Sequence, residues 1–206
     1  MVQSWIIPFA IIMTTRALIH LLTEFAPVLS FFVVGQFTSF YTATLVLVIA
    51  TILTSAIGLL TEKKVPLLPL ISGFFVVSSG IITLIYQKPD ALIFADSLYY
   101  FLMALAIAGG LSVRFNLLKR IFASTFAMTD RGWNILALRW VTIFLLAGIA
   151  NELVRTLLTP DDWVDFKFIK AITIALFGFY QFTLSRKYRI EHEANAWGLR
   201  IRDGKD

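Results

Sequence analysis

The chain has 206 residues, of which 58% are hydrophobic and 15% are charged, and its formal net charge is +5. A soluble domain is roughly half apolar and about a quarter charged, so this composition excludes a chain built mainly of soluble domains. Cysteine is absent, which excludes disulfides, thiolate metal sites and cysteine nucleophiles. The long apolar runs are continuous rather than alternating, and this pattern predicts an all-α, polytopic helical membrane protein rather than a β-barrel.

The first predicted segment, residues 1–24, is apolar but carries a polar stripe. Arg16, His20 and Glu24 recur at every fourth residue, so a helix would place them on one face. We interpret the stripe either as the water-exposed side of a helix at the membrane interface or as a polar face turned toward other helices. The segment has no positively charged start and no small-residue cleavage site, so we expect it to be retained rather than cleaved as a signal peptide.

A membrane domain is predicted over residues 25–187. It opens with an apolar stretch at 25–37 that is only about 20 Å long as a helix, with Pro27 near its start. Because a hydrocarbon core is about 30 Å thick, a half-crossing or re-entrant helix is expected there. Five spans follow, at about residues 40–60, 70–86, 92–113, 133–158 and 163–184. Before the fourth span, Lys and Arg residues are spaced through an apolar segment. This pattern predicts a surface helix at about residues 115–128.

Lys and Arg are distributed unequally between the two sides of this predicted topology. They gather in the loops at 62–66 and 114–131 and in a basic tail at 188–206, whereas the loops at 87–96 and 159–166 hold mainly aspartate. The positive-inside rule therefore predicts a cytoplasmic C-terminus. The cations flank apolar spans and form no nucleic-acid-binding module, so anionic lipid headgroups are the expected partners and nucleic acid is not.

The turn between the fourth and fifth spans concentrates polar residues in an otherwise apolar region. Its candidate site residues are Asn151, Glu152, Arg155, Trp163 and Lys167. Glu152 and Arg155 are three residues apart and can pair along one helix near the outer membrane boundary. Thr159, Asp161 and Asp162 are candidate caps for the helix that follows.

Lys167 and Lys170 lie a few residues inside the fifth span, where a charge is costly. They either extend back to the membrane surface or meet Glu152 or Asn151 across the hairpin, because the two helices are antiparallel and joined by a short turn. Two interpretations of the cluster follow. One is the end of a span and the start of a capped helix. The other is a clamp of paired charges that also contacts a lipid or a partner protein.

Residues able to carry chemistry or to hold metal ions are few. His20 and His192 lie far apart in the sequence, so no histidine metal centre is predicted. No phosphate-binding loop, acid-rich metal motif or Ser-x-x-Lys pattern occurs, so neither a cofactor nor an enzymatic activity is expected. A weaker alternative is an enzyme in which Glu24 or Glu152 exchanges protons with His20, but a substrate-binding pattern is missing.

Four stretches of the sequence resemble one known family. They are APVLSFFVVGQF at 26–37, YTATLVLVIATIL at 41–53, VSSGIITLIYQKPDALIF at 77–94, and NILALRWVTIFLLAGIANELVRTLLTPDDWVDFKF at 134–168. The last is the strongest, with an asparagine near a span end and then a Trp-Val-x-Phe-Lys element, here Trp163, Val164, Phe166 and Lys167. The resemblance, over about residues 25–186, is to the intracellular septation protein A family of small bacterial inner-membrane proteins. Where that family usually carries lysines and a Pro-Thr, this chain has Phe94-Ala95-Asp96-Ser97.

The resemblance implies a bacterial inner-membrane protein with a role in envelope biogenesis, envelope integrity, membrane homeostasis and division, and with no known enzymatic activity. On this interpretation the protein is a scaffold whose partners are membrane lipids and envelope-assembly or division proteins. The alternative is a small transporter or lipid-handling protein whose polar path includes the short 25–37 helix, Glu24 and the Asn151/Glu152/Arg155/Lys167 cluster. The absence of an internal sequence repeat weighs against this alternative.

Overall fold

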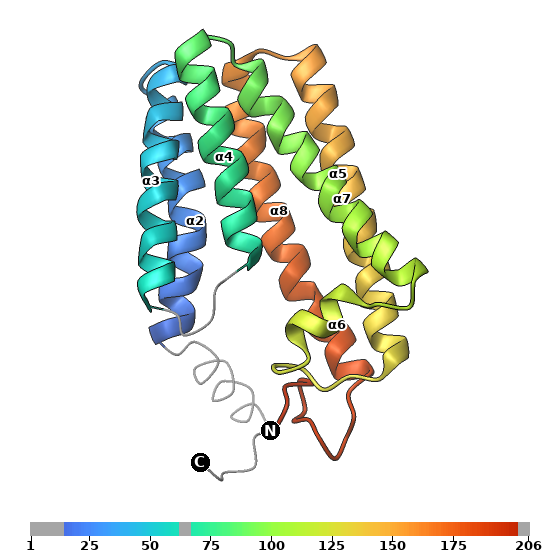
Figure 1. Ribbon diagram of the computed structural model, residues 1–206. Helices are drawn as coiled ribbons and strands as arrows, with labels where there is room; N and C mark the ends of the chain where they lie inside the picture. The colour runs from blue at the N-terminus through green and yellow to red at the C-terminus, as the bar shows by residue number, and fades with distance from the viewer. Residues whose placement is uncertain (1–14, 62–66, 202–206) are drawn as a thin grey trace, which may run out of the picture. The chain divides into compact units, whose positions relative to one another are not determined.

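The computed structural model describes the backbone of residues 15–61 and 67–201, and the side chains of residues 25–60 and 70–201. Its described part is helical through the apolar sequence (Figure 1). The helices are α2 (Thr15–Gly35), α3 (Phe40–Thr61), α4 (Leu67–Tyr86), α5 (Asp90–Ser112), α6 (Leu117–Phe122), α7 (Asp130–Leu157) and α8 (Pro160–Lys187). The predicted all-α fold is therefore confirmed.

Four described segments are long and apolar enough to cross a membrane: Phe40–Leu60, and the full lengths of α5, α7 and α8. Two shorter apolar stretches, Phe25–Gly35 in α2 and Leu70–Tyr86 in α4, accompany them. Each of the five predicted spans thus lies on a helix, and the chain is a polytopic helical membrane protein. Residues 25–35 continue a helix that begins at Thr15, so Pro27 lies inside α2 rather than near its start. An interior proline is tolerated in membrane helices because neighbouring groups satisfy the freed carbonyl.

The predicted surface helix at 115–128 is shorter in the structure, where α6 covers only Leu117–Phe122. Asn116 caps its start, because the Asn116 side chain accepts a hydrogen bond from the backbone N–H of Lys119 at 3.0 Å. After Phe122 the chain leaves the helix, and its backbone groups pair instead with the segment that follows α8. The amphipathic pattern indicated a surface location but carried no information about this long-range pairing.

The chain divides into two compact units, each described here by itself. The N-terminal unit consists of Met1–Ala95 and Leu157–Phe168, and the C-terminal unit consists of Asp96–Thr156 and Ile169–Asp206. Helices α5 and α8 each contribute one end to each unit.

In the N-terminal unit, α3 packs against both α2 and α4. Gly73 and Gly80 of α4 face α3: a Cβ added at Gly73 would lie 3.2 Å from the Ser55 Oγ, and one added at Gly80 would collide with Val48. These small residues let the two helices approach closely. On the other side of the unit, Phe31 of α2 packs edge-on against Trp163 of α8, with ring centroids 5.8 Å apart.

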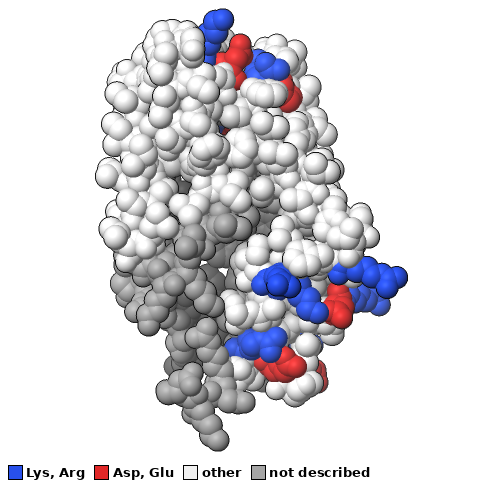
Figure 2. Space-filling model, in the orientation of Figure 1, with Lys and Arg blue, Asp and Glu red and all other residues white. Residues whose placement is uncertain are grey.

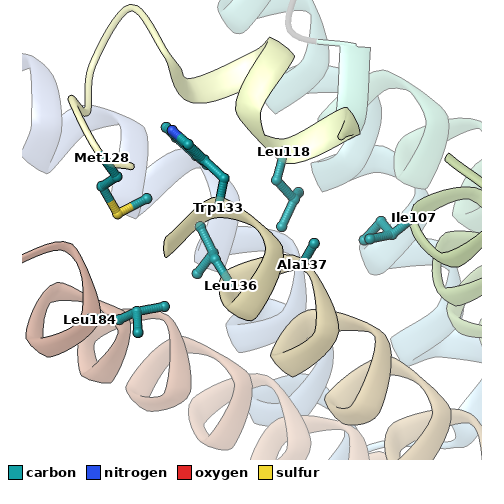
Figure 3. Close-up of a cluster of buried hydrophobic side chains, with 7 residues drawn as sticks. All are labelled: Ile107, Leu118, Met128, Trp133, Leu136, Ala137 and Leu184. Atoms are coloured by element: carbon teal, nitrogen blue, oxygen red, sulfur yellow. The ribbon is translucent and has the colours of Figure 1, made fainter. Parts of the chain in front are cut away.

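In the C-terminal unit, an apolar core joins α5, α6, α7 and α8 (Figure 3). Its buried members are Ile107, Leu118, Met128, Trp133, Leu136, Ala137 and Leu184. Trp133, Leu136 and Ala137 follow one another at helical spacing on α7 and point into the space between α6 and α8. The first two turns of α7 are therefore anchored by protein contacts.

The segment at residues 188–201 is folded against the loop that follows α6. The Ile190 N–H donates to the Ala127 carbonyl at 3.0 Å, and the Arg200 N–H donates to the Thr125 carbonyl at 2.8 Å. Gly198 has a φ of +80°, a conformation that favours glycine, and its carbonyl accepts from the Ala127 N–H. Residues 188–201 therefore form part of a compact cap at the ends of α6 and α8, and we call them the terminal segment.

Charged side chains of the C-terminal unit gather over α6 and the terminal segment, while the helices above them present a mainly uncharged surface (Figure 2). The cap carries Arg114, Lys119, Arg120, Arg131, Arg186, Lys187, Arg189 and Arg200. Lys119 pairs with Asp130, and Arg200 pairs with Glu193. Lys and Arg outnumber Asp and Glu, so the cap is basic, as expected for a surface that meets anionic headgroups.

Candidate functional site

A buried ion pair lies in the C-terminal unit, between α5 and α8. The Lys170 amine donates hydrogen bonds to the Asp96 carboxylate and to the Asn151 carbonyl oxygen, the latter at 2.6 Å. The same amine lies 4.7 Å from the centre of the Tyr100 ring. Lys170 is 6% exposed and the Asp96 side chain 11% exposed, so both charges are removed from solvent.

Asn151 extends this pair into a network that includes α7. Its side chain is fully buried, and its amide N–H donates to the Ser97 hydroxyl at 2.8 Å while its carbonyl accepts from Lys170. An asparagine amide offers both a donor and an acceptor, so this one residue bridges α5 and α8. We call Asp96, Ser97, Tyr100, Asn151 and Lys170 the polar network.

Local sequence positions these groups. Asp96 and Tyr100 are four residues apart on α5, so both face the same neighbour. On α7, Gly148 lies three residues before Asn151, and a Cβ added there would lie 2.8 Å from the Phe101 ring of α5. The glycine therefore allows α5 and α7 to approach closely enough for Asn151 to reach Ser97.

The energetics of the network favour a structural role. Charges inside a membrane protein are costly and are retained when they pair with one another and with hydrogen-bonding groups. Removing one partner of a buried pair typically costs about 3–5 kcal/mol, because the other charge is left uncompensated. The polar network joins α5, α7 and α8 through these interactions.

Glu152 and Arg155 form a second ion pair beside the network. The Arg155 guanidinium contacts one Glu152 carboxylate oxygen, Oε2, at 2.7 Å, and each side chain is 28% exposed. This is the i,i+3 pair that the spacing predicts. The other oxygen, Oε1, is buried without a hydrogen-bond partner, although the Ser97 hydroxyl lies beside the carboxylate.

The remaining two candidate residues lie in the N-terminal unit. Trp163 is fully buried, and the Lys167 amine lies over its ring at 4.8 Å from the centre. They are four residues apart on α8, which places the amine on the ring's face. Trp163 also contacts Phe31 and Phe40, so the lysine and an aromatic cluster form one packed group.

The five candidate residues therefore fall into two groups. Asn151, Glu152 and Arg155 lie in the C-terminal unit, whereas Trp163 and Lys167 lie in the N-terminal unit. Of the contacts considered across the hairpin, the one between Lys170 and Asn151 forms. The predicted polar stripe of Arg16, His20 and Glu24 concerns side chains outside the described residues.

Sequence reasoning missed Asp96, Ser97 and Tyr100 as site residues. Asp96 was assigned to an outer loop, but it lies in the second turn of α5, which begins at Asp90. The available signal was the departure from the family pattern at Asp96-Ser97, because a carboxylate inside a span requires a cation as partner. Among the described side chains, no group of three His, Cys, Asp or Glu is arranged to hold a metal ion.

The helix after the hairpin begins with a reciprocal cap. The Asp162 carboxylate accepts from the Thr159 N–H at 3.0 Å, and the Asp162 N–H donates to the Thr159 hydroxyl at 3.3 Å. Two of the three candidate caps therefore act together, in the manner of a capping box. This arrangement fixes the start of α8 and thus the position of Lys167 and Lys170 along it.

Comparison with known proteins identifies relatives over most of this structure. A family model described as intracellular septation protein A matches residues 19–192. Inner membrane-spanning protein YciB of Nitrobacter hamburgensis is 29% identical over 175 residues, covering 84% of this chain and 88% of the relative. The YciB protein of Brucella melitensis biotype 2 is 32% identical over 157 residues, covering 75% and 71% of the two chains. No solved structure matches. The chain belongs to the intracellular septation protein A family.

Proposed function

We propose that the protein is a non-enzymatic inner-membrane protein that acts in envelope biogenesis, envelope integrity, membrane homeostasis and septation. It acts through helix packing and through contacts with membrane lipids and with envelope-assembly or division proteins. The family's description as a septation protein and the relatives' description as inner membrane-spanning proteins support this role. The basic cap supports a cytoplasmic C-terminus, because cations accumulate on the cytoplasmic side.

The observation that carries the proposal is the polar network. Lys170 donates to Asp96 and to the Asn151 oxygen, and one Asn151 amide N–H donates to Ser97. Groups used in this way hold α5, α7 and α8 together and are not aimed at a substrate. A scaffold needs such a fixed arrangement of helices in order to present constant surfaces to its partners.

A paired replacement tests this role in cells that lack their own copy of the protein. The double variant Lys170→Met/Asp96→Leu removes both charges and keeps side chains of similar size, and such replacements are often neutral. We expect normal division and envelope integrity at an unchanged level of membrane-inserted protein. A folded double variant without function would show that the charges themselves act, and would reject the packing role.

Partner contacts are tested by photo-crosslinking in living cells. Trp163 is fully buried and is unsuitable for this purpose, whereas Phe37 and Lys119 are exposed. We expect a crosslinker at Lys119 to capture a defined envelope-assembly or division protein, with Phe37 as the comparison site at a different helix end. Capture of lipid alone at both positions would contradict the protein-scaffold part of the proposal.

One observation favours the alternative of a transporter or lipid-handling protein. The buried Glu152 Oε1 lacks a hydrogen-bond partner, so this oxygen can accept a hydrogen bond from a polar ligand. Glu152→Gln discriminates the two functions, because it keeps the side chain's shape and removes its charge. The scaffold proposal predicts a mild effect, whereas loss of function in a folded Glu152→Gln protein would favour transport.

A further inference from the structure

An apolar cavity lies in the C-terminal unit between α6, α7 and α8. Its volume is about 190 Å³, and Phe122, Phe126, Trp140 and Phe182 contribute aromatic walls. Leu118, Met128 and Leu136 form the side next to the apolar core (Figure 3). An apolar cavity of about 150 Å³ accommodates a benzene-sized group, so this one has room for a short length of hydrocarbon chain.

The two polar side chains on the cavity wall are already engaged. The Ser185 hydroxyl is bonded to the Trp197 carbonyl at 2.7 Å. The Gln181 amide donates to the Phe177 carbonyl at 2.9 Å, and its oxygen accepts from Arg139 at 3.2 Å. The cavity interior therefore offers mainly apolar contact, and both of these polar side chains are held by other groups.

Arg139 lies next to the cavity, because it is bonded to the lining residue Gln181. Its guanidinium contacts Gln181 and lies 5.5 Å from the centre of the Tyr180 ring. Its described partners include no carboxylate, which contrasts with Arg155 and Lys170, each paired with an acid. A guanidinium has five N–H donors in a planar fork that suits phosphate, and Gln181 uses one of them.

A helix centred on the hydrocarbon core would place the Arg139 backbone about 8 Å inside it, so the long side chain must extend back to reach the headgroups. α7 has 28 residues and is about 42 Å long, whereas a hydrocarbon core is about 30 Å thick. Arg139 is nine residues after Asp130, the first residue of α7, or about 14 Å along the axis. Side chains on a helix lean toward its N-terminus, so the guanidinium extends toward the basic cap and away from the hydrocarbon.

We propose that this cavity is a binding site for one anionic phospholipid of the surrounding bilayer. A short length of one acyl chain occupies the apolar cavity, and the lipid phosphate binds the Arg139 guanidinium beside Gln181. Charge complementarity supports an anionic occupant, because the nearby cap carries more Lys and Arg than Asp and Glu. The site is separate from the polar network, and the lipid-binding proposal does not depend on the proposed role in septation.

The first test uses Trp140 as a reporter, because this side chain lines the cavity. The full chain is reconstituted in phosphatidylcholine vesicles that contain brominated phosphatidylglycerol or brominated phosphatidylcholine, and tryptophan quenching is measured. Subtracting the signal of Trp140→Phe isolates the reporter. We expect phosphatidylglycerol to bind about fivefold more tightly, the factor for about 1 kcal/mol per cation at a membrane surface.

Charge variants separate the proposed site from general attraction to the basic cap. Arg139→Gln should abolish the preference for phosphatidylglycerol, while Arg139→Lys should keep most of it. Arg120→Gln is the matched control, because Arg120 also belongs to the basic cap but lies over Phe115, a residue that does not line the cavity. Equal quenching by the two lipids in the unaltered protein would overturn the proposed preference for an anionic lipid. An unchanged preference in folded Arg139→Gln would do the same.

A glycine pair tests whether a chain occupies the cavity. Gly178 lines it, and a Cβ added there would be 4.0 Å from the Trp140 ring, so Gly178→Leu fits at its base and fills the space beyond. Gly109→Leu on α5 is the control, because a Cβ added there meets nothing within 4 Å. We expect loss of Trp140 quenching by both lipids only in Gly178→Leu. Retained quenching in this variant, or no quenching in the unaltered protein, would overturn the proposal.

Discussion

Lys167 and Lys170 lie one turn apart on the same helix and have the same exposure, 6%, yet their surroundings differ. Lys167, in the N-terminal unit, places its amine over the Trp163 ring within an aromatic cluster. Lys170, in the C-terminal unit, binds a carboxylate and an amide oxygen. Equal burial of two charges therefore does not mean that they make the same contacts. The partner decides how much is lost when the charge is removed.

The largest effect is expected for Lys170→Met. It leaves the Asp96 carboxylate and the Asn151 oxygen buried without their donor, and loss of one member of a buried pair costs about 3–5 kcal/mol. The free energy of unfolding is measured in detergent by a denaturant titration. A loss smaller than that of Asn151→Leu would contradict the predicted order.

Asn151→Leu should have the next largest effect. The side chain is fully buried, and its removal takes one partner each from Ser97 and Lys170, at about 1–3 kcal/mol for unsatisfied polar groups. The same titration measures it, and Asn134→Leu on α7 is the matched control, because it removes a single exposed hydrogen bond with Asn116. An effect equal to that of the control would mean that Asn151 does not join the helices.

The contact between Lys167 and Trp163 should contribute less than either. A desolvated cation–π contact contributes about 2 kcal/mol or less, and Lys167→Met still packs on the aromatic cluster. Trp163→Leu separates the ring's electrostatic role from its packing role, because it also opens space beside Phe31 and Phe40. We expect the tryptophan variant to lose clearly more stability than the lysine variant.

The smallest effect is expected for the Glu152–Arg155 pair. Both side chains are partly exposed, and pairs at such positions contribute less than about 1 kcal/mol. A double-mutant cycle with Glu152→Gln and Arg155→Gln measures their coupling in the same detergent. Coupling as large as that of a buried pair would show that this site resembles Lys170 rather than a surface pair.

Most of the fold was predictable from local patterns, because membrane helices follow from apolar length alone. The helices over 40–60, 92–112 and 133–157 needed no knowledge of distant contacts. The terminal segment was different, because its backbone pairs with residues 125–129, more than fifty positions earlier. From local sequence alone, a basic polar stretch at this position is predicted to be a tail. The end of α6 was misjudged for the same reason.

The candidate site was predictable in part. Two sequence features predicted a site at the hairpin between α7 and α8. They are the spacing of Glu152 and Arg155 and the position of Lys170 inside a span. Asp96 was missed because its partner lies 74 residues away, and a single aspartate near a helix start resembles an ordinary cap or loop residue. Its role required the placement of three helices, which local sequence does not specify.

The most direct test of the polar network is a double-mutant cycle between Asp96 and Lys170. Asp96→Leu, Lys170→Met and the double variant are unfolded under the same condition. A joint structural role predicts a coupling free energy of about 2 kcal/mol or more, with the double variant more stable than Lys170→Met alone. Additive losses, with a coupling energy near zero, would show that the two charges act independently and would contradict the account.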